Sequence, residues 1–118
     1  MKAYLIDPVQ RDITLVDVAE EETLKDMYDK LSYTDHEVDK VEAVGLNFNH
    51  CIYVDEEGLF KPNRDFFNFR ITNTNTVRLV GRGLVMAHNR EGDMIDVGIS
   101  LRELYSRFFS YQPVEDAL

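Results

Sequence analysis

Short apolar stretches that alternate with polar positions occupy the start of the chain. Residues 2–7 and 12–18 are rich in branched and aromatic side chains, and the segment between them begins with Pro8. This pattern predicts two strands that are joined by a tight turn. We therefore expect an N-terminal β-hairpin whose buried side chains include the following residues: Tyr4, Ile6, Ile13 and Leu15.

The apolar spacing changes after Glu21. Large apolar side chains then recur at i, i+3, i+4 and i+7, at Leu24, Met27, Tyr28 and Leu31. This spacing predicts an α-helix with one apolar face, and the i, i+4 pair of Asp26 and Lys30 supports its polar side. We expect the apolar face to pack against a sheet that includes the four hairpin residues named above.

A second hairpin is predicted after an acidic loop at residues 32–39. Residues 40–48 and 51–55 have strand composition and turn at Asn49 and His50. Residues 55–58 then form a turn signal in which Gly58 can adopt a positive φ. We expect Leu59 and Phe60 to return the chain to the core.

The second half of the chain predicts further strands and a final helix. Phe66, Phe67 and Phe69 form an aromatic cluster, and residues 73–76 are polar enough for an exposed loop. Residues 77–87 have strand composition, with Gly81 and Gly83 indicating a bulge or a close backbone approach. Ser100 and Glu103 have capping-box spacing. This predicts a helix at residues 101–109, with a frayed tail from about residue 112. Its apolar face is expected to contain the following residues: Leu101, Leu104, Tyr105 and Phe108.

These elements predict one α+β domain over residues 1–118, with a mainly antiparallel sheet and two helices. No apolar run approaches the roughly 20 residues of a membrane span, and charge follows Met1 too early for a signal peptide. A single cysteine, Cys51, cannot form an internal disulfide. We therefore expect a cytoplasmic protein that is not associated with a membrane.

The net charge of −9 is concentrated in the first half of the chain. Residues 1–60 carry 5 basic and 15 acidic side chains, whereas residues 61–118 carry 8 basic and 7 acidic side chains. Such acidity disfavours direct binding to nucleic acid phosphates. Seven of the eight basic residues of the second half are arginines, which suit bidentate recognition of carboxylates or phosphates.

Most local patterns that could carry chemistry fail a simple geometric test. His50 and Cys51 are adjacent on a predicted strand, so they point to opposite faces and are poorly placed to share a proton. We expect Cys51 to be buried and inert. The histidines lack metal-ligand spacing, and Met86 stands where a dinucleotide-binding fingerprint requires its third glycine. No catalytic residue, metal site or cofactor is predicted.

Two interpretations remain for the arginines. Arg70, Arg78 and Arg82 flank predicted strands, and together with His88 they could hold an anionic small molecule or nucleotide, including a hydrolysable one. Alternatively, they form surface salt bridges with the carboxylates of the first half. The second interpretation is favoured because those carboxylates are in excess.

Three segments, at residues 2–8, 52–61 and 79–86, carry a resemblance to known proteins. They resemble a family of small proteins of unknown function that phages, plasmids and other bacterial mobile elements carry. The resemblance extends from the first predicted strand to the last helix and is most specific in two segments, YVDEEGL at residues 53–59 and GRGLV at residues 81–85. It implies an accessory protein that binds host or element machinery, and it implies no catalytic residue.

Charge and resemblance together predict a non-enzymatic protein-binding module. Its acidic surface, with Glu20, Glu21 and Glu22, is expected to contact a host or mobile-element protein and to modulate or inhibit it. One form of this hypothesis is a nucleic-acid mimic that presents carboxylates to a DNA-binding enzyme. The alternative is the small-molecule or nucleotide binder that uses the arginines.

Overall fold

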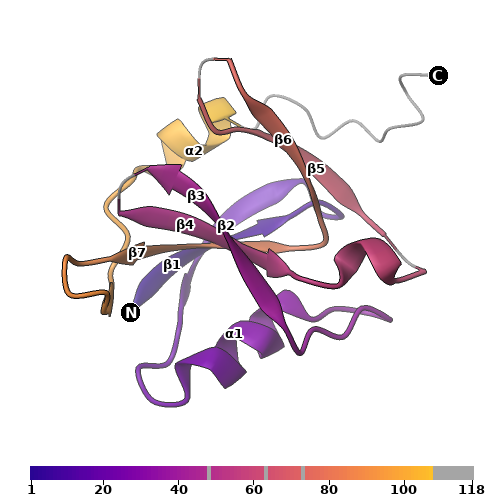
Figure 1. The fold of residues 1–118 in the computed structure, drawn as a ribbon, viewed down its shortest axis with the longest axis horizontal. Helices are drawn as coiled ribbons and strands as arrows, with labels where there is room; N and C mark the ends of the chain where they lie inside the picture. Colours follow the sequence, from indigo (N-terminus) through magenta and orange to yellow (C-terminus); the bar gives the residue numbers. More distant parts are fainter. Residues whose placement is uncertain (48, 63, 73, 108–118) are drawn as a thin grey trace.

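A six-stranded antiparallel sheet forms the centre of the molecule in the computed structural model, which describes residues 1–47, 49–62, 64–72 and 74–107. Figure 1 shows the ribbon. The strand order in this described part is β2-β1-β7-β4-β3, with β8 paired to the end of β7. The bounds are β1 (Lys2–Asp7), β2 (Asp12–Asp17), β3 (Val41–Asn47), β4 (His50–Asp55), β7 (Gly83–His88) and β8 (Met94–Ile95). The predicted α+β domain with a mainly antiparallel sheet is confirmed.

The two predicted hairpins form the two sides of this sheet. In the first, Tyr4 lies opposite Leu15, and the Asp7 carboxylate accepts hydrogen bonds from the backbone N–H groups of Val9 and Gln10, which closes the turn. In the second, β3 pairs with β4 with a register shift between Gly45 and Asn47. Each hairpin is local in sequence, as predicted.

β7 joins the two hairpins and is the central strand of the sheet. Val85 lies opposite Tyr4 of β1 on one side and opposite Ile52 of β4 on the other. Residues 83–87 are all buried. An apolar run without alternation is typical of a strand that is covered on both faces.

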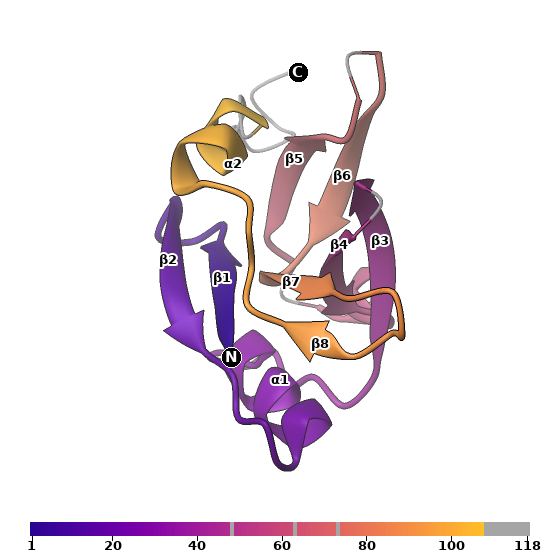
Figure 2. The same ribbon diagram turned by 90° about the vertical axis from the view of Figure 1, so that its left-hand side faces the viewer.

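Each face of the sheet has its own hydrophobic cluster. α1 (Thr23–Leu31) covers one face, where Met27 and Leu31 pack with Ala3, Leu84 and Met86. The opposite face is covered by a two-stranded ribbon, β5 (Phe66–Arg70) with β6 (Thr76–Val80), and by α2 (Leu101–Arg107). Figure 2 shows α1 and the β5–β6 ribbon on opposite sides of the sheet.

The predicted helix is confirmed and packs on the predicted sheet, but the four side chains named for that sheet do not contact it. Tyr4, Ile6 and Ile13 belong to the cluster on the opposite face, away from α1, and Leu15 is 53% exposed at the edge strand β2. Both faces of β1 carry apolar side chains because both faces of the sheet are covered. The alternation along β1 therefore does not indicate which face the helix contacts.

Two further expectations are corrected. Leu59 and Phe60 do not return to the core: they lie in a 3₁₀ turn, η1 (Gly58–Phe60), and are 62% and 88% exposed. Residues 77–87 are not one bulged strand, because the chain leaves the β5–β6 ribbon at Gly81, which has φ +77°, and enters the main sheet at Gly83. The close approach is confirmed: a Cβ on Gly83 would lie 3.0 Å from Phe67 Cζ.

α2 begins with the predicted cap, because the Ser100 hydroxyl accepts a hydrogen bond of 3.1 Å from the Glu103 backbone N–H. Leu104 is buried, whereas Leu101 and Tyr105 are partly exposed at its sides. Phe108, the predicted end of this helix and the tail from residue 112 lie outside the described residues. None of the helices within the described ranges is long and apolar enough to span a bilayer.

Candidate functional site

A buried polar network connects the loop after α1 to the end of β4. His36 Nε2 lies 2.9 Å from Asp55 Oδ2, and both side chains are almost fully buried. Lys61 binds the same carboxylate oxygen from the segment after η1. The other carboxylate oxygen of Asp55, Oδ1, accepts a hydrogen bond from the backbone N–H of Glu57. The Asp55 carboxylate therefore ties together three connections that lie apart in sequence.

Tyr33 and Arg82 extend this network. The Tyr33 ring stacks on His36 with a centroid distance of 4.8 Å, and its hydroxyl donates a hydrogen bond of 2.9 Å to Asp65. Burial, followed by the Asp65 hydrogen bond, raises the pKa of Tyr33. The Arg82 guanidinium lies over the Tyr33 ring and forms an ion pair of 3.3 Å with Asp7.

Two members of this network, His36 and Asp55, are buried away from solvent. His36 is only 1% exposed, and a Cβ on Gly81 would lie 3.2 Å from His36 Nε2. A general base must reach the proton that it removes, and the buried His36 imidazole cannot reach a proton on a molecule in solvent. The buried His36–Asp55 pair therefore fastens loops of the fold.

The four residues of the predicted ligand site lie in different places. Arg70 donates to the Ser106 carbonyl oxygen of α2, and Arg78 lies over the Phe66 ring. Arg82 donates to the carbonyl oxygens of Lys30 and Ser32 at the end of α1.

Register places Arg70 and Arg78 on one face of the β5–β6 ribbon, because Arg78 lies opposite Asn68, two residues from Arg70. Arg82 and His88 are outside this ribbon. His88 Nε2 lies 2.9 Å from the Tyr53 hydroxyl. The four side chains therefore do not converge on one pocket. Arg82 pairs with the first-half carboxylate of Asp7, which is buried rather than at the surface.

The predicted partner-binding residues form an acidic surface at the start of α1. Glu20, Glu21 and Glu22 are exposed on the connection from β2 to α1. Two of them line a shallow hollow of about 270 Å³ whose other lining residues are Ala19, Lys25, Asp26 and Asp29. We call residues 20–22 with Asp26 and Asp29 the acidic face.

Asp26 organises the acidic face. Its carboxylate accepts hydrogen bonds from Lys30 Nζ at 2.9 Å and from the Ala19 backbone N–H at 2.8 Å. These bonds, with that from Lys30 the largest cause, lower the pKa of Asp26. Asp26 therefore anchors the connection to the helix and is paired with Lys30, whereas Glu20, Glu21 and Glu22 are exposed.

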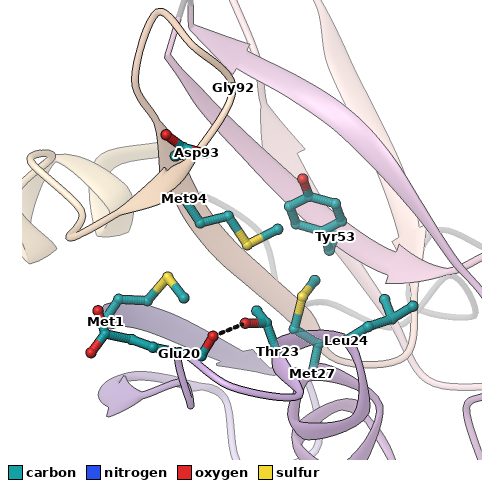
Figure 3. A pocket seen from close by; sticks show the side chains of 9 residues that line it. All are labelled: Met1, Glu20, Thr23, Leu24, Met27, Tyr53, Gly92, Asp93 and Met94. Atoms are coloured by element: carbon teal, nitrogen blue, oxygen red, sulfur yellow. Dashed lines mark hydrogen bonds between the residues drawn. The ribbon is translucent and has the colours of Figure 1, made fainter.

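A groove with both apolar and polar lining residues adjoins the acidic face. It has a volume of about 440 Å³ and lies between α1, β4 and the β7–β8 connection. Figure 3 shows the Met27 and Met94 side chains pointing toward the Tyr53 ring, with Met1 beside them. The lining residues are Met1, Glu20, Thr23, Leu24, Met27, Tyr53, Gly92, Asp93 and Met94. Below, "the groove" means these nine residues.

Leu24 connects the groove to the sequence pattern. The helical spacing placed it on the buried face, yet it is 51% exposed and forms one wall of the groove. The remaining apolar walls, Met1, Tyr53 and Met94, come from segments far apart in sequence. No local sequence pattern could have identified these three residues. Leu24 is a wall residue that the helical spacing singled out, although that spacing predicted it to be buried.

Cys51 and His50 lie on opposite faces of β4, as predicted. Cys51 is partly exposed rather than fully buried. His50 is buried, and Gly98 N–H donates a hydrogen bond of 3.1 Å to its Nε2. Across the described ranges, no three side chains of His, Cys, Asp or Glu are grouped so that they could hold a metal ion.

Comparisons of this chain with protein-family profiles, with curated proteins and with solved structures give no match. The resemblance to mobile-element proteins stays a prediction. Function must therefore be argued from the acidic face and the groove.

Proposed function

We propose that this protein is a non-enzymatic binding module that contacts a basic partner protein through the acidic face. The observation that carries the proposal is the exposure of Glu20, Glu21 and Glu22 on one short connection. Five carboxylates and two lysines lie within residues 20–30, and one of those lysines is engaged by Asp26. The surface therefore keeps an excess of negative charge.

A binding role also agrees with the way in which the polar side chains are used. His36, Asp55 and Tyr33 bind one another and the neighbouring loops. Active sites hold titratable groups in clefts that a substrate can enter, whereas His36 and Asp55 are almost fully buried. Recognition by surface charge requires no such cleft.

The resemblance to mobile-element proteins suggests the class of partner. We place the contact in the cytoplasm, with a host protein or another protein of the same element, whose activity this chain would modulate or inhibit. Complementary charge speeds encounter and selects among partners. An acidic face is thus suited to a basic site on such a protein.

The proposal is tested with three immobilised baits and a lysate of a bacterial host. The first is the unaltered protein, and the second carries Glu20→Gln, Glu21→Gln and Glu22→Gln. The third is a matched control with the same change in net charge, Asp39→Asn, Glu42→Gln and Glu56→Gln, at exposed positions around the paired ends of β3 and β4.

A protein that the first and third baits retain, that the second bait loses and that salt elutes would support the proposal. Retention of the same proteins by all three baits would contradict it. If the retained protein binds DNA, competition by duplex DNA tests the mimic form: displacement supports mimicry, and simultaneous binding of DNA and this chain excludes it.

A further inference from the structure

The groove offers apolar surface that α1 and the sheet do not cover. Leu24 is half exposed beside it, and three of the four methionines of the chain line it, namely Met1, Met27 and Met94. Methionine side chains are flexible and polarisable, so they adapt to the shape of an apolar group that enters. The groove is thus suited to receive an apolar side chain.

The charge at the groove favours a cationic occupant. Glu20 and Asp93 are exposed acidic residues that line it. They outnumber the one cation among its described lining residues, the Met1 ammonium, which donates a hydrogen bond to the Val18 carbonyl oxygen. Glu20 belongs also to the acidic face, so the groove and the negative surface are continuous. An anionic lipid or nucleotide would meet repulsion there, whereas a lysine or arginine would meet attraction.

The size of the groove fits an anchoring side chain. Its volume of about 440 Å³ lies within the range of roughly 300–1,000 Å³ that is typical of ligand pockets. In protein interfaces, a few large side chains that fill such pockets carry most of the binding energy. The aromatic ring of Tyr53 adds a flat surface on which an aliphatic or aromatic anchor can pack.

We infer that the groove binds a basic protein segment that inserts a large apolar side chain between α1 and the β7–β8 connection. Its flanking lysines or arginines then face Glu20, Asp93 and the acidic face. This inference rests on the proposed function and deepens it, because it specifies the chemistry of the partner: positive charge next to an apolar anchor.

The methionines allow a direct test by NMR. With 13C-labelled methionine methyl groups, we expect a short peptide of lysine and leucine, with leucines spaced i, i+3, i+4 and i+7, to shift the signals of Met1, Met27 and Met94. Met86, which is fully buried and outside the groove lining, serves as the internal control. The same peptide with alanine in place of leucine should leave all four signals in place.

Two leucines provide matched variants. Leu24→Ala removes one wall of the groove, and Leu15→Ala removes a side chain of nearly equal exposure, 53% against 51%, at the β2 edge. We expect Leu24→Ala to weaken peptide binding about tenfold, mainly through faster dissociation. Leu15→Ala should leave the affinity unchanged, and circular dichroism checks that both variants are folded.

Three results would overturn the inference. They are a lack of peptide binding, binding without shifts at Met1, Met27 and Met94, and equal affinity of the two leucine variants. Equal shifts with a simple cationic amphiphile such as dodecylamine would also overturn it, since the groove would then not require a protein segment. None of these results affects the bait experiment, so failure of the groove is distinguishable from failure of the acidic face.

Discussion

His50 is held as a neutral imidazole by its hydrogen bonds. Because Gly98 N–H donates to Nε2, the proton lies on Nδ1, which donates to the Asn49 side-chain oxygen at 2.8 Å. Burial lowers the pKa of His50, and the nearby charge of Glu103 opposes this effect while His88 adds to it. Protonation of Nε2 would break the bond to Gly98, which positions the segment before α2.

This arrangement predicts a pH dependence of stability. The unfolded chain binds a proton on His50 near pH 6.5, whereas the folded state binds it only at lower pH. Below about pH 6.5 the free energy of unfolding should therefore fall, by at most about 1.4 kcal/mol per pH unit from this group. Above that pH, His50 is neutral in both the folded and the unfolded state, and its contribution to the free energy of unfolding no longer changes with pH.

Urea unfolding at a series of pH values measures this effect, and His50→Gln is the control because glutamine keeps an acceptor for Gly98. The difference in free energy of unfolding between the two proteins should be constant above about pH 7 and should change as the pH falls below about 6.5. An NMR titration in which His50 has a pKa at or above its ordinary value would contradict the prediction.

Glu22 lies in the left-handed region, with φ 55°, immediately before α1. A side chain with a Cβ is strained there, at a cost of about 1–2 kcal/mol, and glycine is not. We expect Glu22→Gly to raise the free energy of unfolding by about 0.5–1 kcal/mol, since glycine also loses more backbone entropy. Glu22→Ala, which removes the charge and keeps the Cβ, should give no such gain in urea unfolding.

At the scale of elements, α1 is held to the sheet by Leu31, which is 0% exposed. Leu31→Ala should lower the free energy of unfolding by about 2–5 kcal/mol, because the lost transfer energy and the remaining cavity add. Leu24→Ala on the same helix should cost less than about 1 kcal/mol, because half of its side chain is already in water. Similar losses for both variants in denaturant unfolding would show that the buried face of α1 is assigned incorrectly.

The elements differ in how far the sequence predicts them. The helix and both hairpins follow from local spacing, and Glu20, Glu21 and Glu22 are contiguous, so the acidic face was visible before folding. The groove was not, because Met1, Tyr53 and Met94 come together only when β4, β7 and β8 are in place. The His36–Asp55 pair depends equally on long-range contacts. The prediction that Leu59 and Phe60 enter the core was wrong, because apolar side chains alone do not bring a short turn into the core.

At the scale of the whole molecule, the acidic face should act over a distance and therefore respond to salt. The Debye length falls from about 10 Å at 0.1 M salt to about 3 Å at 1 M. We expect the association rate with a captured partner to fall steeply over this range while the dissociation rate changes little.

Surface plasmon resonance measures both rates. Neutralising Glu20, Glu21 and Glu22 together should slow association about tenfold at low salt and remove most of the salt dependence. The control with Asp39→Asn, Glu42→Gln and Glu56→Gln should retain it. An association rate that is indifferent to salt would contradict the electrostatic mechanism.

The position of β7 has a consequence for synthesis on the ribosome. β1 is made first, yet one of its two neighbours in the sheet, β7, begins only at Gly83. A nascent chain that ends before this residue can form its two hairpins but cannot join them, so their strand edges remain open to other chains. The main sheet can therefore form only after residues 83–88 have been synthesised, and stalled or truncated products that lack these residues should aggregate or be degraded rather than accumulate.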